Sequence, residues 1–327
     1  MKRLFIILTS LVAVLFVAAL VIGPARVGPI DSLRALIVGD AGPLTLVMRE
    51  IRLPRAILAV VIGGALGLAG AAMQGYLRNP LADPGLIGVS GSAALGAVLS
   101  IQTGLAASVA FALPVAALAG ALIGVLLVLV LAGPRGSSLT LILAGIAISA
   151  LAGALTSLVL NLSPNPFAAN EIVFWMMGSL ADRSMTHVWI ALPLILIGAV
   201  LLVMLARGLD ALTLGEDAAE AMGIGLRRLR LTLIFGTAAV VGASTAVAGA
   251  IGFVGLVVPH ILRGFVGARP GRLLWASMLG GAIMLLLADI AVRVVLPARD
   301  LKLGVLTALV GAPLFLHLIY RTRRAGL

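Results

Sequence analysis

Unbroken apolar stretches of about 20 residues recur along almost the whole chain of 327 residues. A helix needs roughly 20 apolar residues to cross the hydrocarbon core of a bilayer, so each stretch has the length of one span. Hydrophobic residues make up 62% of the chain and charged residues 11%, whereas a soluble domain is about half apolar and a quarter charged. The sequence therefore excludes a soluble globular protein and predicts an all-α polytopic membrane protein.

About ten segments are predicted to be transmembrane helices. The apolar runs are continuous and do not alternate with a period of two, which argues against a transmembrane barrel. The predicted spans are 4–22, 56–76, 86–101, 105–132, 139–160, 188–206, 231–250, 251–266, 273–292 and 303–320. A signal peptide is the alternative for the first span, but its apolar run exceeds the usual signal core of about 7 to 15 residues. The least marked boundaries lie within 86–132 and 231–266, where glycine and proline are the main interruptions.

The basic residues indicate which side of the membrane each connection faces. With the N-terminus inside, the cytoplasmic segments hold the larger share of the 23 Lys and Arg residues, as the positive-inside rule prefers. Both termini are then cytoplasmic. The net charge of +11 does not indicate nucleic-acid binding, because these residues lie in short connections and not on one continuous face.

The chain lacks the residues that several kinds of chemistry require. The chain has no Cys, which excludes disulfides and thiolate sites. Neither of its lysines, Lys2 and Lys302, follows a Gly as a P-loop requires, so nucleotide hydrolysis of that kind must come from another chain. The three histidines, His187, His260 and His317, are far apart and lack metal-ligand spacing, so no metal site is expected. His260 follows Pro259, where we expect it to satisfy carbonyls of a broken helix.

Glycines are spaced four apart within one predicted span. The run 63–70 reads Gly-Gly-Ala-Leu-Gly-Leu-Ala-Gly, which places small residues on one helix face. Small residues allow helix backbones to approach closely in membranes. The run therefore predicts a close helix crossing and indicates no particular function.

A polar segment between two spans predicts a short cytoplasmic helix. Its acids are Glu216, Asp217 and Glu220, and three arginines follow at 227, 228 and 230. Such a helix has the length to dock into a groove on a partner. A solvated connector is the alternative, and composition alone leaves the two open.

Charged residues also gather near the outer ends of two spans. Arg52 and Arg55 precede one span, and Asp289 and Arg293 lie four residues apart near the end of another, where they can form an ion pair on one helix face. Exposed arginines can bind acidic side chains of a docking protein by bidentate contacts. They can equally anchor to lipid headgroups.

The connection 78–91 is rich in proline and glycine, which prevent one continuous helix. Irregular backbone at membrane depth is tolerated where it is buried in protein or lines a cavity. We therefore expect this segment to line a pathway or to form part of a gate.

These motifs together carry a family likeness. They are 52–55 (Arg-Leu-Pro-Arg), 79–85 (Asn-Pro-Leu-Ala-Asp-Pro-Gly), 215–216 with 221–223, 249–260 (Gly-Ala-Ile-Gly-Phe-Val-Gly-Leu-Val-Val-Pro-His), 285–289 and 304–313. In this order the chain resembles the permease subunits of ABC importers for ferric siderophores, haem and cobalamin, the FecCD or BtuC type. The likeness covers nearly the whole sequence.

The resemblance implies a fold and a set of partners. It implies the type II ABC importer permease fold, a single transmembrane domain over 1–327 with two inverted five-helix halves. The chain would form a homodimer in the bacterial inner membrane, with two copies of a separate ABC ATPase and one periplasmic substrate-binding protein. ATP and Mg would be bound by the ATPase, with no cofactor on this chain, which would be a transport subunit and not an enzyme.

The resemblance also assigns roles to residues. The coupling segment, within about 207–230, would insert into the ATPase through Gly215, Glu216, Asp217, Ala218, Ala219, Glu220, Ala221, Met222 and Gly223. We expect the Ala218–Ala219 surface to contribute to that contact. Glutamates of the binding protein would be received by Arg52, Arg55 and Arg293. The cytoplasmic gate would comprise Asn79, Leu81, Ser138 and Leu139.

One departure from the family pattern bears on the cargo. Family members often carry Glu-Leu-Pro before the Gly that opens the last span, whereas this chain has Asp300-Leu301-Lys302-Leu303 before Gly304. Lys302, beside Arg299, would favour an anionic cargo electrostatically, although it can also extend to the interface and bind none. A ferric siderophore is the first expectation, haem the second and cobalamin the third.

Two other classes of function remain as alternatives. A secondary transporter driven by protons or sodium would use Asp289, the one acid placed within a predicted span. A membrane-embedded enzyme is the third class, but the sequence shows no cluster of nucleophile, base and orienting group.

Overall fold

The computed structural model describes the chain except residues 24–27, 40–41, 110, 134–136, 296–300 and 325–327, together with the side chains of 318–319 and 321–324. The described residues form helices and connections. The helices are α1 (Lys2–Val21), α2 (Pro29–Ile37), α3 (Pro43–Leu46), α4 (Leu53–Tyr76), α5 (Val89–Gln102), α6 (Leu105–Ser108), α7 (Ala112–Ala132), α8 (Ser138–Asn161), α9 (Pro166–Met176), α10 (Met185–Met204), α11 (Ala206–Leu212), α12 (Glu216–Ala221), α13 (Leu226–Ala248), α14 (Val254–Arg263), α15 (Pro270–Val295) and α16 (Leu303–Arg324). A π-helical turn, η1 (Val47–Arg52), joins α3 to α4, and 3₁₀ turns form η2 (Pro84–Ile87) and η3 (Gly264–Val266).

The predicted spans correspond to helices, with corrected ends. By length and composition, seven helical stretches among the described residues can cross a membrane: α1, the continuous stretch Pro43–Tyr76, α7, α8, α10, α13 and α15. Three shorter apolar helices, Val89–Gln102, Val254–Val266 and Leu303–His317, account for the other predicted spans.

Two predicted spans are shorter than expected. The predicted span 105–132 is divided into α6 and α7, and the predicted span 251–266 becomes helical only at Val254. Non-helical backbone explains both corrections. Val109 ends α6 in an extended conformation, with φ of −128° and ψ of 118°, and Phe253 precedes α14 in the left-handed region with φ of 68°. A continuous right-handed helix contains neither conformation.

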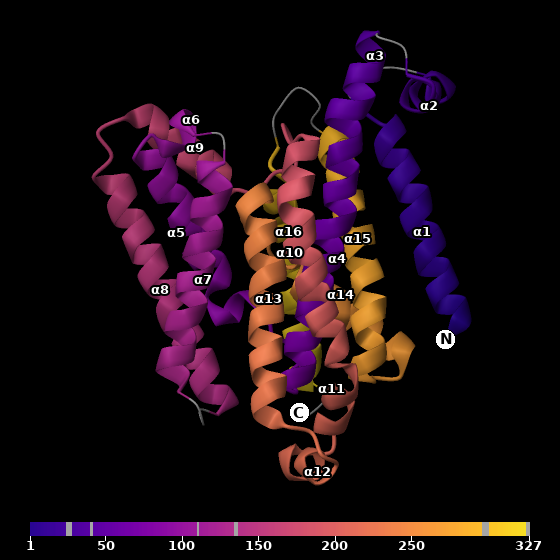
Figure 1. The fold of residues 1–327 in the computed structure, drawn as a ribbon. Helices are drawn as coiled ribbons and strands as arrows, with labels where there is room; N and C mark the ends of the chain where they lie inside the picture. Colours follow the sequence, from indigo (N-terminus) through magenta and orange to yellow (C-terminus); the bar gives the residue numbers. More distant parts are fainter. Residues whose placement is uncertain (24–27, 40–41, 110, 134–136, 296–300, 325–327) are drawn as a thin grey trace.

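Helix α4 lies at the centre of one group of helices. It packs against α15, α14, α10, α13 and α1. Helices α5, α7 and α8 form a second group, which contacts the first through α13. Figure 1 shows this second group on one side of the molecule and α1 at the opposite edge.

Glycines allow the helices around α4 to touch. A Cβ on Gly67 would overlap the carbonyl of Ser277 in α15, and one on Gly70 would overlap the carbonyl of Gly255 in α14. Gly63 and Gly281 are in mutual contact in the same way. The close crossing predicted from the glycine run is confirmed, and its partners are α15 and α14.

The two ends of the molecule differ. Helices α11 and α12 project at one end, toward which α1 begins and α16 ends, whereas α2 and α3 lie at the other end (Figure 1). We call these the α12 end and the α2 end. Large apolar side chains remain exposed along the spans, such as Ile6, Val130 and Val200, as a lipid-facing surface requires.

Candidate functional site

The predicted coupling segment forms the outermost helix of the α12 end. Gly215 and Gly223, with φ of 106° and 83°, flank α12 and allow the sharp turns at its two ends. Leu214 and Met222 are 71% and 53% exposed beside the exposed Glu216. An apolar pair with acids beside it is a surface suited to a protein partner.

One residue of this segment does not lie where the sequence suggested. We expected Ala218 and Ala219 to form part of the partner surface, but Ala219 has no exposed area. Ala219 packs into the hydrophobic core, and its carbonyl accepts a hydrogen bond from the N–H of Ile224 at 3.0 Å. The surface that α12 offers therefore consists of its acids and the flanking Leu214 and Met222.

The two predicted gate segments come together at the α12 end. Asn79 accepts a hydrogen bond from the N–H of Leu81 through Oδ1 at 2.9 Å, which shapes the turn after α4. The hydroxyl of Tyr76, the last residue of α4, lies near the side chain of Ser138, the first residue of α8. Leu139 beside it is 64% exposed.

Charged groups surround this junction. Arg230 and Glu216 both lie within electrostatic range of the Tyr76 hydroxyl. Arg230 is buried and donates from Nη2 to the carbonyl of Gly133 at 3.2 Å. The coupling segment and the gate segments therefore lie close together.

A buried polar network holds α14 against the last turns of α4. Gln74, which has no exposed area, donates to the carbonyl of Leu256 at 3.1 Å and accepts from Nη2 of Arg263 at 3.0 Å. The ring of His260 lies near the carbonyl of Pro80 in the gate segment, and its buried Nδ1 has no hydrogen-bond partner among the described residues. The expected bond from His260 to a carbonyl of its own broken helix is therefore not confirmed. Among the described residues, no three His, Cys, Asp or Glu side chains gather as metal ligands.

Asp289 is the centre of a charged cluster toward the α2 end. Its carboxylate, which has no exposed area, accepts from Nε of Arg55 at 2.7 Å and from Nη2 of Arg293. The predicted pair of Asp289 and Arg293 is thus present, with Arg55 as a second partner. Arg293 also donates from Nη1 to the carbonyls of Ala19 and Ile22, at 2.7 and 3.1 Å.

The three arginines predicted to bind a docking protein differ in how far they are exposed. Arg52 is only 4% exposed and donates from Nη1 to the carbonyls of Leu20 and Val21, each at 2.9 Å. Arg52 and Arg293 therefore bind the last carbonyls of α1, where cations are favoured by the helix dipole. This corrects the expectation that both are exposed. Arg55 keeps 16% of its side chain exposed.

Lys302 lies at the start of α16 with its Nζ 5.4 Å from the centre of the Phe174 ring in α9, which is a cation–π distance. Arg299 and Asp300, the charged neighbours in the prediction, lie outside the described residues. Next to this contact a cleft of about 620 Å³ opens between α9, the α13–α14 connection and α16, lined by Met176, Met177, Phe253, Leu309 and Pro313.

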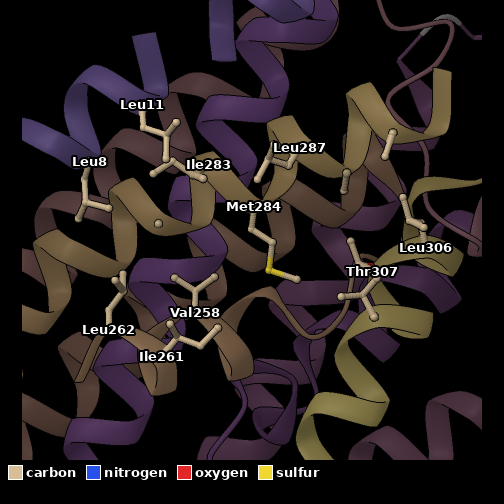
Figure 2. Close-up of a pocket in the computed structure, with 14 residues that line it drawn as sticks. Leu8, Leu11, Val258, Ile261, Leu262, Ile283, Met284, Leu287, Leu306 and Thr307 are labelled. Carbon is tan, nitrogen blue, oxygen red and sulfur yellow. The ribbon is translucent and has the colours of Figure 1, made fainter. Parts of the chain in front are cut away.

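A second cavity, of about 460 Å³, lies between α1, α14, α15 and α16 (Figure 2). Leu8, Val258 and Met284 project into it, and Thr307 is the one polar residue among its described lining residues. These lining residues include no charged group to bind a charged ligand, and they match the lipid-facing surface of the spans.

Comparison with known proteins decides the family. The model of the FecCD transport family matches residues 11–321. The chain belongs to the FecCD transport family. As a FecCD protein it is an ABC transporter permease, and its fold is that of a type II ABC importer permease, as the sequence predicted.

Relatives of this FecCD chain include two named permeases. It is 40% identical to the hemin transport system permease protein HmuU of Yersinia pestis, over 84% of this chain and 83% of the relative. It is 40% identical to the vitamin B12 import system permease protein BtuC of Salmonella paratyphi A, over 84% of each. A metal-chelate type ABC transporter solved in an inward-facing conformation superposes with a TM-score of 0.87 and 34% identity, over 98% of this chain and 100% of that one.

The structure adds residues to the FecCD site that the sequence did not single out. Tyr76 lies near Ser138 of the gate, Phe174 contacts Lys302, and Asp210 accepts a hydrogen bond from the N–H of Gly271 at 2.7 Å. The partners of these three residues are distant in sequence, so no local spacing predicts the contacts. Asp210 precedes the acidic segment, and its charge is the one sequence feature that could have drawn attention to it.

Proposed function

We propose that this FecCD chain is the membrane subunit of an ATP-driven importer that brings an iron chelate into the cytoplasm. A ferric siderophore is the first cargo proposed, haem the second and cobalamin the third. The similarity to HmuU, a hemin permease, and to BtuC, a vitamin B12 permease, supports a bulky chelate or macrocycle as cargo.

The observation that carries the proposal is the projecting α12 helix. Its exposed acids and the exposed Leu214 and Met222 form a surface beyond the spans, and the chain has no P-loop lysine of its own. A separate ATPase that binds this surface supplies the energy. We further propose a homodimer with two ATPase copies, ATP and Mg being bound by the ATPases.

The mechanism follows from the placement of the segments. A loaded binding protein docks at the α2 end through Arg55, and closure of the ATPases on ATP moves α12 at the other end. The gate segments at Asn79, Leu81, Ser138 and Leu139 then change between outward and inward access, a population shift driven by the nucleotide. In this proposal both termini lie in the cytoplasm and the chain lies in the bacterial inner membrane.

The ion-gradient alternative finds no support at Asp289. Both carboxylate oxygens of Asp289 are engaged by guanidinium groups. Because both oxygens form ion pairs that join α4 to α15, the geometry supports a structural role for Asp289 and not that of an ion carrier.

The test combines purification with transport. We expect affinity purification from the native host in mild detergent to bring down a stoichiometric Walker-A ATPase, identified by mass spectrometry. Reconstituted with that ATPase and the binding protein, the chain should import cargo when ion gradients are collapsed and stop without ATP. Uptake that follows the ion gradient and ignores ATP would overturn the proposal.

A further inference from the structure

The short helix α11 lies between the coupling segment and two spans. Helix α12 contacts α11 and α13, whereas α11 contacts α12, α15 and α4. The buried face of α11 consists of Gly208, Leu209 and Leu212. Any displacement of α12 therefore acts on α11 directly.

The link between α11 and α12 is hydrogen-bonded along its whole length. Its three residues, 213–215, donate their N–H groups to the carbonyls of residues 210–212, at 3.3, 3.0 and 3.1 Å in that order. The hydroxyl of Thr213 also donates to the carbonyl of Asp210 at 2.6 Å. Because every N–H of this link is hydrogen-bonded to α11, a displacement of α12 acts on α11.

Asp210 connects α11 to the start of α15. Its Oδ1 accepts the N–H of Gly271, the second residue of α15, at 2.7 Å. That N–H has no partner within its own helix, and a carboxylate there is also favoured by the helix dipole. A Cβ on residue 271 would lie 2.9 Å from Oδ2 of Asp210, so glycine leaves the space for this cap.

The end of α4 meets the same junction. A Cβ on Gly75 would lie 3.2 Å from Cβ of Pro270 and 3.5 Å from Cδ1 of Leu209. Next along the chain, the N–H of Asn79 donates to the carbonyl of Gln74 at 3.2 Å. The start of α15, the middle of α11 and the turn that begins the gate segment therefore pack together.

We propose that Asp210 is a positioning residue, which ties α11 to α15 so that displacement of α12 moves the start of α15 and the end of α4 together. The gate segment at Asn79 moves with the end of α4. Through α15 the movement also reaches Asp289 and Arg293 toward the α2 end. The inference rests on the proposed function, because it names the route by which the ATPase acts on the gate.

The test is the number of cargo molecules imported per ATP hydrolysed, in proteoliposomes that hold the chain, its ATPase and its binding protein. We expect Asp210→Ala to lower this ratio at least fivefold, with the ATPase still assembled and hydrolysing ATP. Asp210→Asn keeps the acceptor oxygen and should stay within twofold of the unmodified chain. If Asp210→Ala fails to assemble, Gly271→Ala gives the same test, because its methyl group displaces the carboxylate.

The matched control is Asn165→Ala, which removes another side-chain cap, at the start of α9, and should leave the ratio unchanged. A ratio in Asp210→Ala equal to that of the unmodified chain, or lowered no more than in Asn165→Ala, overturns the inference alone. Absence of ATP-dependent uptake by the unmodified chain overturns the proposed function as well. The two failures are therefore distinguishable.

Discussion

Asp289 of α15 binds Arg55 of α4 as well as Arg293 of its own helix. Arg293 in turn binds the last carbonyls of α1, as Arg52 does. The carboxylate is therefore the group that joins three helices toward the α2 end. It is also the one acidic partner that the described structure gives to either guanidinium.

Removal of this carboxylate should destabilise the protein strongly. Asp289→Ala leaves the buried Arg293 without its counter-charge, and breaking a buried pair in this way costs about 3 to 5 kcal/mol. We expect a large drop in the thermal unfolding midpoint of the detergent-purified chain, with a smaller drop for Asp289→Asn. Asp31→Ala, on the exposed face of α2, is the control. A midpoint of Asp289→Ala close to that of Asp31→Ala would contradict the assignment.

The three outer arginines should separate into two roles. Arg55→Ala should weaken docking of the binding protein, mainly through a slower association rate and a reduced salt dependence, because a partly exposed charge steers encounter. Arg52→Ala should instead lower stability by about 1 to 3 kcal/mol, since it leaves buried carbonyls of α1 unpaired. Surface plasmon resonance and thermal unfolding measure the two effects. Loss of docking by a stable Arg52→Ala protein would show that the division is wrong.

The sequence predicted local relationships well and distant ones poorly. The spacing of four residues sufficed to pair Asp289 with Arg293, whereas Arg55 is 234 residues away from Asp289 and no pattern connects them. The glycine run predicted a close crossing, but the identity of its partners depends on the packing of the whole bundle. The family motif around residues 79–85 predicted a gate segment, but not that Tyr76 lies near Ser138.

Errors arose where burial depends on tertiary contacts. The family resemblance places Ala219 on the partner surface, yet the fold of α12 directs it into the core. Arg52 and Arg293 were expected to be exposed because arginine usually is. The carbonyls at the end of α1 supply partners that composition cannot reveal.

The crossing of α4 with α14 should tolerate no side chain at Gly70. Gly70→Ala would place a methyl group against the carbonyl of Gly255, and such overpacking costs about 1 to 3 kcal/mol. Gly153→Ala is the matched control, because nothing lies within 4 Å of its Cβ position. We expect a lower unfolding midpoint and a lower yield for the first variant alone. Equal midpoints for both variants would show that the helices separate without cost.

The surface of α12 should bind the ATPase. Glu216→Lys reverses an exposed charge on this helix, and Met222→Ala removes an exposed apolar contact. Both variants should bring down less ATPase in an affinity purification and show reduced uptake. Glu171→Lys makes the same charge change on α9, which lies toward the α2 end, and should leave the yield of ATPase unchanged. An undiminished ATPase yield with Glu216→Lys and Met222→Ala combined would exclude this surface.

Lys302 should select for anionic cargo. Its ammonium group is held over Phe174 beside the cleft between α9 and α16, and a cation at such a mouth attracts an anion. Lys302→Ala should therefore lower uptake of an anionic chelate several-fold while uptake of a neutral one is little changed. Lys302→Arg keeps the charge and should preserve the preference, and Phe174→Leu should weaken it by releasing the ammonium. Equal effects of Lys302→Ala on both cargos would indicate that Lys302 contacts lipid headgroups, and that the preference is set elsewhere in the pathway.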